Sequence, residues 1–242
     1  MNRIAIVTGA GQRIGRAIAL GLAARGWWVV VHCNRSQAEA GAVAEQIRAG
    51  GGRADVLTAD LADIDAVRGL IPRCVEMAGP PSCLVNNASL FAKDGVDTMT
   101  PEGWQAHMDV NLRAPVFLAQ AFAAALPAGQ TGCIVNLIDQ RVLRPVPRFF
   151  TYAVSKSALW WATQTMAQAL APNVRVNAIA PGPVLPSIHQ SRGDFDGERA
   201  GTLLGHGAEP EHIAATVQFI LDTPSMTGEM ITLDGGQHLT FR

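Results

Sequence analysis

Tyr152 and Lys156 are the residues of this chain whose types and spacing point most directly to chemistry. Tyr152 is the single tyrosine in 242 residues, and Lys156 is one of two lysines. A separation of four places both side chains on one face of a helix. A nearby ammonium favours phenolate and lowers a phenol pKa from about 10, so Tyr152 is predicted to be a proton donor tuned by Lys156. The alternative is that Tyr152 packs against or caps the helix while Lys156 is solvated.

A glycine-containing turn at residues 8–15, Thr-Gly-Ala-Gly-Gln-Arg-Ile-Gly, follows the first apolar run. Glycines let the backbone turn sharply and approach a pyrophosphate, which would lie on the N-terminal end of the next helix. Because the turn stands between a predicted strand and a predicted helix, it indicates a dinucleotide site rather than a structural turn. The six histidines show no metal-ligand spacing, and no metal is predicted.

The second apolar run ends in Val-His-Cys-Asn-Arg-Ser at residues 31–36. An acidic residue here would bind the ribose hydroxyls of NAD, and none is present. Arg35 and Ser36 instead offer a cation and a hydroxyl that suit a 2′-phosphate. We therefore predict NADP(H) as the cofactor. The alternative is that Arg35 is a solvated surface charge and Ser36 a helix cap.

Seven short apolar runs alternate with longer amphipathic stretches. The runs are continuous, which is typical of strands buried on both faces of a parallel sheet. The expected fold is α/β: a single doubly wound Rossmann-type domain over residues 1–242, with a seven-stranded parallel sheet and helices on both faces. Strands are expected at 4–7, 27–31, 56–58, 83–85, 133–137, 174–179 and 230–233, and helices at about 13–25, 36–49, 63–77, 101–126, 152–170 and 209–222.

Residues 183–208 break this rhythm with five glycines, two prolines and weak periodicity. A loop of that length inside a compact domain is usually functional or disordered. It follows the sixth strand, at the sheet edge where open α/β proteins bind ligands. We predict a substrate lid, with a tolerated insertion as the alternative.

Composition narrows the classes of function. A net charge of −1 argues against nucleic acid as a main ligand. The chain shows neither a signal-peptide pattern nor a membrane-length apolar segment, and its four cysteines are scattered as reduced thiols would be. A soluble cytoplasmic protein that acts on a small molecule is expected.

Taken together, these motifs resemble those of the short-chain dehydrogenase/reductases over nearly the whole chain. The resemblance implies that Asp60 lies near the adenine, Asn87 near the cofactor ribose and Lys156 on the nicotinamide ribose. It also implies that Asn111 holds a water in a proton relay to Tyr152. The shared motifs are the turn at 8–15, Asp60-Leu61, Asn86-Asn87-Ala88, Asn111, the Tyr152/Lys156 pair, Pro181-Gly182 and Asp234-Gly235-Gly236. The implied cofactor-binding residues are Gly9, Gln12, Arg13, Ile14, His32, Asn34, Arg35, Ser36, Asp60, Leu61, Asn87, Ala88, Ser89, Lys156, Pro181 and Gly182.

Asp139 stands thirteen residues before Tyr152, where the family usually has its catalytic serine. A serine donates a hydrogen bond to a carbonyl oxygen that is becoming an alkoxide, whereas an ionised aspartate repels that anion. Asp139 favours a substrate with N–H donors, such as one with a ring C=N bond. Arg141, Arg144 and Arg148 follow in the same segment and are interpreted as solvated charges, with attraction of an anionic ligand as the alternative.

Three further departures point to one subgroup. Arg13 replaces the middle glycine of the turn, Ser89 replaces the glycine common after Asn-Asn-Ala, and Phe91 follows two residues later. With Asp139 and Tyr152, this set resembles the pteridine reductases and the dihydromonapterin reductase-type enzymes. The resemblance implies a pterin stacked between the nicotinamide and Phe91, contacted by Arg13, Ser89, Asp139 and Tyr152. The alternatives are that Phe91 is a core residue and that Arg13 pairs only with the pyrophosphate.

The sequence thus predicts an NADPH-dependent reductase that transfers hydride to a C=N bond of a pteridine, from dihydropterin to tetrahydropterin. Tyr152, Lys156, Asp139 and Asn111 are the predicted catalytic residues. One alternative is an NADPH-dependent carbonyl reductase of a 3-oxoacyl or sugar-like ketone; another is a non-catalytic NADP-binding regulatory protein. The resemblance implies a homotetramer, and Phe241-Arg242 is hypothesised to reach a neighbouring subunit's pocket.

Overall fold

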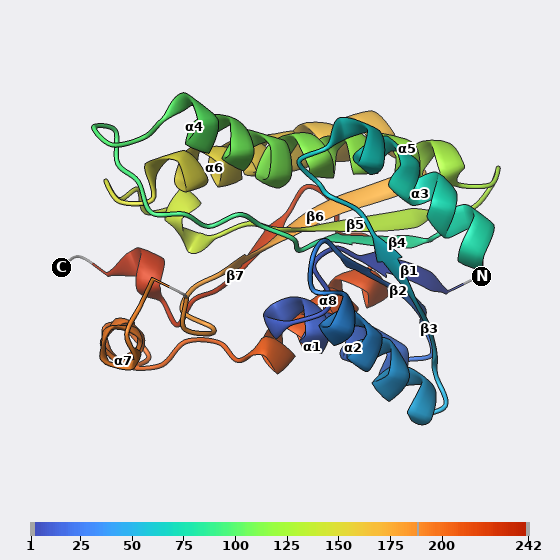
Figure 1. Ribbon diagram of the computed structural model, residues 1–242, viewed down its shortest axis with the longest axis horizontal. Helices are drawn as coiled ribbons and strands as arrows, with labels where there is room; N and C mark the ends of the chain where they lie inside the picture. Colours follow the sequence, from blue (N-terminus) through green and yellow to red (C-terminus); the bar gives the residue numbers. More distant parts are fainter. Residues whose placement is uncertain (1–2, 188, 241–242) are drawn as a thin grey trace.

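A seven-stranded, wholly parallel sheet in the order β3-β2-β1-β4-β5-β6-β7 forms the centre of the molecule (Figure 1). The structure is a computed structural model and describes residues 3–187 and 189–240. The strand order reverses beside β1, where such sheets open a crevice for ligands at their carboxyl edge. The predicted fold class is confirmed. The strands are β1 (Ile4–Val7), β2 (Trp28–Cys33), β3 (Arg53–Thr58), β4 (Cys83–Asn86), β5 (Gly132–Leu137), β6 (Val174–Pro181) and β7 (Met230–Leu233).

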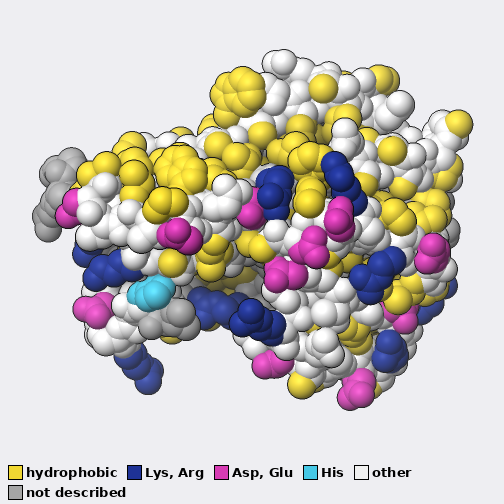
Figure 2. Space-filling model, turned by 45° about the horizontal axis from the view of Figure 1, so that its top comes forward, with side chains coloured by type: hydrophobic (Ala, Val, Ile, Leu, Met, Phe, Trp, Pro, Cys, Tyr) yellow, Lys and Arg dark blue, Asp and Glu magenta, His cyan; other side chains and the backbone are white. Residues whose placement is uncertain are grey.

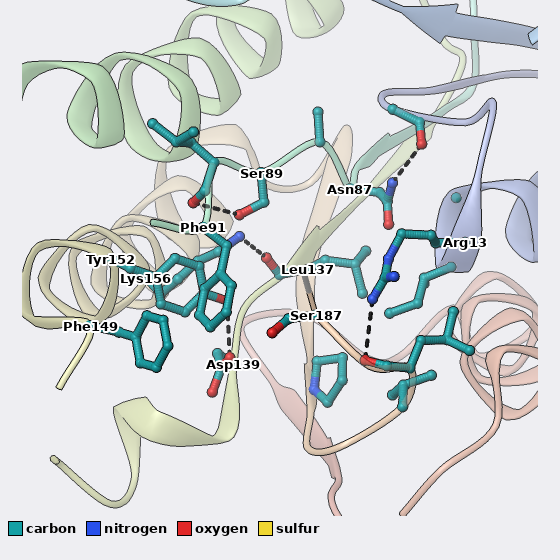
Figure 3. A pocket seen from close by; sticks show the side chains of 18 of the residues that line it. Arg13, Asn87, Ser89, Phe91, Leu137, Asp139, Phe149, Tyr152, Lys156 and Ser187 are labelled. Atoms are coloured by element: carbon teal, nitrogen blue, oxygen red, sulfur yellow. Dashed lines mark hydrogen bonds between the residues drawn. The ribbon is translucent and has the colours of Figure 1, made fainter. Parts of the chain in front are cut away.

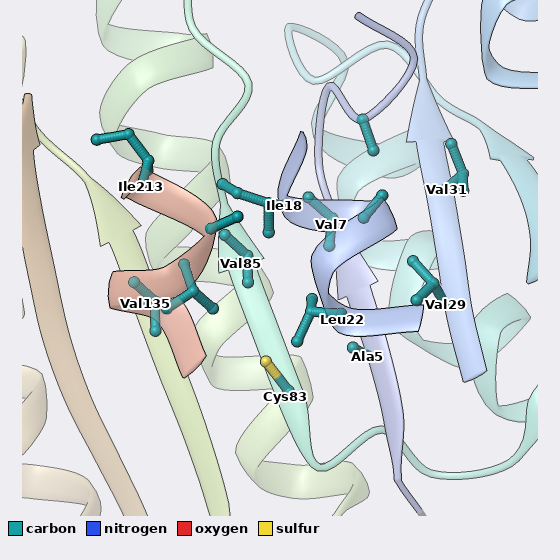
Figure 4. Packing of buried hydrophobic residues seen from close by; sticks show 14 of the residues in the cluster. Ala5, Val7, Ile18, Leu22, Val29, Val31, Cys83, Val85, Val135 and Ile213 are labelled. Atoms are coloured by element: carbon teal, nitrogen blue, oxygen red, sulfur yellow. The ribbon is translucent and has the colours of Figure 1, made fainter. Parts of the chain in front are cut away.

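Helices cover both faces of the sheet (Figure 1). Because successive strand residues point to opposite faces, Ala5 and Val7 of β1 join one core cluster while Ile4 and Ile6 join the other. The first cluster packs against α1 (Arg13–Ala24), α2 (Gln37–Ala49) and α8 (Pro210–Asp222), as Figure 4 shows for α1 and α8. The second packs against α3 (Ile64–Ala78), α5 (Ala114–Ala125) and α6 (Phe150–Leu170).

The prediction of one continuous helix over 101–126 is wrong, because the helix is interrupted. The structure has α4 (Pro101–Met108), a π-helical segment (Asp109–Arg113) and then α5. Pro115 in the first turn of α5 has no N–H to give to the carbonyl four residues earlier, which fits the change of helical register just before it. Such π-turns are frequent at functional sites, and this one contains Asn111.

Residues 183–208 were expected to lack regular structure, and they contain a helix, α7 (Arg192–Ala200). Ser191 and Asp194 form a capping box at its start. Phe195 is the one buried residue of α7, so the segment carries no helical periodicity for a sequence pattern to detect. α7 lies apart from the two helical layers, beyond the carboxyl ends of the strands (Figure 1).

Across the described residues, every helix is too short or too polar to span a bilayer. The hypothesis about Phe241-Arg242 concerns residues outside the described part of the chain.

Candidate active site

The carboxyl ends of the strands open into a cavity of ≈ 1360 Å³. This volume exceeds that of an ordinary small-ligand site and can hold a dinucleotide together with a second molecule. All the residues predicted to bind the cofactor lie along it, and so do Phe91, Asp139 and Tyr152. Figure 2 shows one face of the molecule, on which Lys and Arg side chains border a hollow.

The glycine turn leaves room for a phosphate because two positions there exclude a side chain. Gly9 has φ +63°, in the left-handed region, and a Cβ on Gly15 would lie 2.2 Å from the Gly9 carbonyl oxygen. Asn87 holds the turn in place, since its Nδ2 donates to the carbonyl oxygens of Thr8 at 2.8 Å and Gly9 at 3.1 Å. The start of α1 is thereby presented to the cavity as a site for a pyrophosphate.

Arg35 and Ser36 lie at the cavity after β2. The Ser36 side chain makes no capping hydrogen bond to α2, so its interpretation as a cap is wrong. Arg35 is exposed, and no carboxylate pairs with it among the described residues. A cation and a hydroxyl are thus both available to a 2′-phosphate.

His32 lies at the cavity wall but acts on the protein rather than on a ligand. Its ring is 1 % exposed. The Gly9 N–H donates to Nδ1 at 3.2 Å, and Nε2 lies 3.1 Å from the Ala59 carbonyl oxygen, to which it must donate. Burial lowers the pKa of His32 to about 4, so the ring is neutral. Both ring nitrogens are bonded to backbone groups, so the His32 ring positions the glycine turn, and contact of His32 with the cofactor stays a prediction.

Tyr152 donates a hydrogen bond from its hydroxyl to Oδ2 of Asp139 at 2.9 Å (Figure 3). Burial, together with the charge and the hydrogen bond of Asp139, raises the pKa of Tyr152 well above its usual range. The expectation that Lys156 lowers this pKa is therefore wrong for the protein alone. The Lys156 Nζ lies 5.8 Å from the ring centroid, and the cation that does lower the Tyr152 pKa is Arg141, whose effect burial and Asp139 outweigh.

Lys156 is buried, 2 % exposed, and its Nζ donates to the Leu137 carbonyl oxygen at 2.7 Å. Burial lowers the pKa of Lys156 to about 8. This contact holds the ammonium at the end of β5, on the cavity wall (Figure 3).

Asn111 is fully buried in the π-helical segment. Its Nδ2 donates to the Leu90 carbonyl oxygen at 2.9 Å and to the Ser155 hydroxyl at 3.0 Å. Its Oδ1 accepts from the Leu90 N–H at 2.8 Å and from the Ser89 hydroxyl at 3.2 Å. The amide therefore fixes the segment that carries Ser89 and Phe91, and a water relay through Asn111 stays a prediction.

Phe91 is partly buried and lines the cavity instead of the core. Its ring stacks on that of Phe149 with centroids 4.3 Å apart and makes a T-shaped contact with the Tyr152 ring, whose centroid is 4.7 Å away. Sequence reasoning missed Phe149, whose φ of +57° places a non-glycine residue in the left-handed region just before α6. Neither its spacing nor its type signalled this position.

Arg13 connects the glycine turn to the segment that follows β6. Its guanidinium donates to the carbonyl oxygens of Pro186 at 2.8 Å and Leu185 at 3.2 Å. Figure 3 shows Arg13 directed toward this segment. Arg13 has φ +53°, an uncommon conformation for a residue with a side chain. In the structure it holds the predicted lid segment, a contact that sequence reasoning did not foresee.

Arg141 also differs from its interpretation as a solvated charge. Its side chain is 18 % exposed, and its Nη1 lies 3.1 Å from Oδ2 of Asp139. His189, a second residue missed from the sequence, lies over the same cavity with Nε2 3.0 Å from the Phe91 carbonyl oxygen. The spacing of Asp139 and Arg141, two residues apart in a turn, was the available signal for the ion pair.

Residues 3–196 match the family model described as short chain dehydrogenase. The chain belongs to this family. A solved relative among the short-chain dehydrogenases, FolM alternative dihydrofolate reductase 1 from Brucella suis in complex with NADP, superposes with a TM-score of 0.97. It is 48% identical, and the match covers 100% of this chain and 97% of that one.

Two curated short-chain dehydrogenase relatives are more distant in sequence. An uncharacterised oxidoreductase of Methylorubrum extorquens is 34% identical over 97% of both chains. A 3-oxoacyl-[acyl-carrier-protein] reductase of Synechocystis is 32% identical over 97% of this chain and 96% of its own. The chain is therefore an oxidoreductase of the short-chain dehydrogenase family. Its relatives are named for different substrates, dihydrofolate in one case and a 3-oxoacyl-[acyl-carrier-protein] in another.

Proposed function

We propose that this short-chain dehydrogenase uses NADPH to reduce a C=N bond of a pteridine, converting a dihydropterin to a tetrahydropterin. The observation that carries the proposal is the hydrogen bond from Tyr152 to Asp139. An ionised carboxylate beside the proton donor suits a substrate edge with N–H donors and opposes the developing oxyanion of a ketone. The relative from Brucella suis, named a dihydrofolate reductase, supports the same substrate class.

The cavity residues fit NADP(H), because Gly9 and Gly15 leave a cradle that a Cβ would fill and Arg35 offers a cation for a 2′-phosphate. When bound, NADPH supplies the hydride. The buried ammonium of Lys156 presents donors at the cavity wall, where a ribose hydroxyl could accept them. Solved relatives in complex with NADP support this cofactor.

The chain's own residues then bind the pterin and hold its proton. The carboxylate of Asp139 accepts hydrogen bonds from the N–H groups at one edge of the ring. Tyr152 retains its proton because its pKa is raised, so it arrives at the reaction as an acid. We propose that this proton passes to the ring nitrogen, with Asp139 orienting the hydroxyl. Phe91 provides an apolar wall for the flat ring.

A ketone reductase is the second candidate, and the named relative from Synechocystis favours it. Such an enzyme must stabilise negative charge on oxygen in the transition state. In this chain Asp139 places a carboxylate 2.9 Å from the proton-donating hydroxyl of Tyr152. That arrangement makes the second candidate the weaker one.

A substrate panel scored by NADPH oxidation separates the two candidates. The panel contains dihydrofolate, dihydrobiopterin and dihydromonapterin, a 3-oxoacyl thioester and a simple ketone, each tested with NADPH and with NADH. We expect turnover of at least one pterin with NADPH, at a kcat/KM at least about tenfold above that for any carbonyl compound. Faster turnover of the thioester or ketone would reject the pteridine proposal, and equal use of NADH would reject the assignment of the cofactor.

We also propose that the chain assembles as a homotetramer. Trp161 on α6 is 68% exposed and Phe219 on α8 is 53% exposed, on opposite faces of the sheet. Exposed large apolar side chains mark surfaces that bind another protein. Two such surfaces on opposite faces would give each subunit two interfaces, as a homotetramer requires.

A further inference from the structure

Arg141 stands between the proton-donating pair and the segment that covers the cavity. Its backbone N–H donates to Oδ1 of Asp139 at 2.8 Å, and its Nη1 lies 3.1 Å from Oδ2. On its other side, Nη2 lies 4.0 Å from Oε1 of Glu198, a residue of α7. The side chains of Arg141 and Glu198 are only 18% and 24% exposed, so water screens this arrangement less than it would on the surface.

The carboxylate of Glu198 contacts side chains from three segments of the chain. Gln190, before α7, donates from Nε2 to Oε2 at 2.6 Å. Gln237, in the turn after β7, donates from Nε2 to Oε1 at 2.9 Å. Arg141 supplies the cation beside it. One carboxylate on α7 thus joins the segment before the helix, the end of the chain after β7 and the turn that carries Asp139.

The guanidinium of Arg141 also covers the aromatic wall. Its central carbon lies 5.7 Å from the ring centroid of Phe91 and 5.4 Å from that of Phe149. Both distances are within the range in which a cation attracts an aromatic face. The Arg141 side chain therefore contacts three parts of the cavity. These are Asp139, which would accept hydrogen bonds from the edge of a pterin, the aromatic wall of Phe91 and Phe149, and Glu198 on α7.

We propose that Arg141 is a positioning residue that couples closure of α7 to the placement of the Asp139 carboxylate. Glu198 is its partner on α7. When α7 is seated, Glu198 holds the guanidinium against Asp139, and the carboxylate keeps one orientation toward both Tyr152 and the ring edge of a substrate. When α7 is displaced, Arg141 loses one of its two anionic partners and Asp139 loses its fixed neighbour. The statement about substrate placement rests on the proposed function, whereas the coupling itself concerns this chain's residues alone.

Hydrogen exchange and kinetics test the coupling in four variants of the full chain: Arg141→Gln, Arg141→Lys, Glu198→Gln and the double variant Arg141→Gln/Glu198→Gln. We expect faster exchange over residues 190–200 in both single Gln variants and no further increase in the double variant. In pterin reduction, Arg141→Gln should lower kcat/KM by about tenfold or more, and the double variant should lose no more than the worse single variant. Arg141→Lys should recover part of the loss, since the cation is restored without the planar fork.

The division of the loss between kcat and KM separates positioning from a merely structural effect. A carboxylate that is no longer held in place misaligns the Tyr152 hydroxyl in the transition state, whereas a lost surface contact changes only substrate binding. Arg141→Gln should therefore lower kcat together with kcat/KM, and Arg141→Lys should recover part of kcat. A loss confined to KM would contradict the proposal.

Arg192→Gln and Asp196→Asn are matched controls, because both are exposed charges of α7 outside this network. Each should leave exchange and kcat/KM within about twofold of wild type. Unchanged exchange of α7 in Arg141→Gln, or independent and additive losses in the double variant, would overturn the coupling. If the wild type turns over no pterin while α7 still exchanges faster in both variants, the proposed function fails and the coupling stands.

Discussion

The phenol of Tyr152 is buried and donates to the carboxylate of Asp139, which also accepts from the guanidinium of Arg141. Burial and Asp139 raise its pKa, and the cation of Arg141 offsets only part of that rise. The protein alone therefore keeps this proton at neutral pH. At the scale of single residues, the proposed function makes Tyr152 the proton donor and gives Asp139 the selection of the substrate.

Replacing Tyr152 with Phe should remove the proton while keeping the ring. We expect kcat for pterin reduction to fall by at least about a hundredfold, since a positioned acid contributes about 10²–10⁴. NADPH affinity, measured by fluorescence titration, should change by less than about threefold, because the phenol hydroxyl is bonded to Asp139. Turnover within about threefold of wild type would remove Tyr152 from the proton transfer.

Burial of Lys156 has a consequence for stability whose sign follows from its lowered pKa. The group loses its proton near pH 8 when folded and near 10.5 when unfolded. Between these values the unfolded chain binds more protons, so folded-state stability rises with pH. Below about pH 8 the group is charged in both states, and the cost of burying it is constant.

The stability of wild type relative to Lys156→Met should therefore increase between pH 8 and 10.5. The increase should be on the order of 3 kcal/mol, at about 1.4 kcal/mol per pKa unit. Urea unfolding at pH 7.5 and 10.5 measures it. Lys93→Met, at the exposed second lysine, is the control and should show a constant difference. A constant difference for Lys156→Met as well would contradict the account.

At the scale of elements, the turn between β1 and α1 could be predicted from sequence because its glycines mark positions where the backbone cannot carry a side chain. Gly9 has a left-handed conformation, and Gly15 lies against the Gly9 carbonyl oxygen. The predicted strands all exist, since their continuous apolar runs are buried on both faces. α7 could not be predicted, because one buried residue, Phe195, and a polar capping box hold it. The π-turn around Asn111 also left no periodic signal, and the ring contact of Phe149 depends on a backbone conformation that its residue type disfavours.

Gly15→Ala should weaken NADPH binding severely while leaving the rest of the fold in place. A Cβ there would lie 2.2 Å from the Gly9 carbonyl oxygen, which the backbone of the turn cannot accommodate without moving. We expect Kd for NADPH to rise by at least about thirtyfold, roughly 2 kcal/mol. Gly41→Ala in α2 is the control, since its Cβ would meet nothing within 4 Å. It should retain wild-type affinity and gain up to about 1 kcal/mol of stability. Equal affinity in both variants would contradict the role of the turn.

At the scale of the whole molecule, one sheet edge gathers residues from the whole length of the chain. Gly9, Asn87 and Asp139 follow three different strands and Pro181 ends a fourth, and all four line one cavity because parallel strands end at the same edge. This topology explains why the sequence could predict that these residues share one cavity. The contacts of Arg13 with Leu185 and of Arg141 with Glu198 could not be predicted, because they depend on the paths of loops.

The exposed Trp161 of α6 gives the assembly proposal its test. Trp161→Glu should place a charge in a subunit contact and convert the tetramer to a smaller species in light scattering, because burying an unpaired charge is costly. Met77→Glu on α3, at a side chain that is 40% exposed, should leave the mass unchanged. A tetramer that survives Trp161→Glu, or a wild-type protein that is a monomer, would reject the proposal.

We propose that Asp139 makes this cavity a site for a nitrogen ring. The decisive measurement is the ratio of kcat/KM for a dihydropterin to kcat/KM for a ketone, with NADPH, in wild type, Asp139→Asn and Asp139→Ser. Asp139→Asn keeps the size of the side chain and removes its charge. We expect the ratio to favour the pterin in wild type and to fall by at least about a hundredfold in both variants, near 3 kcal/mol. A ratio unchanged by either substitution, or a wild type that prefers the ketone, would contradict the proposal.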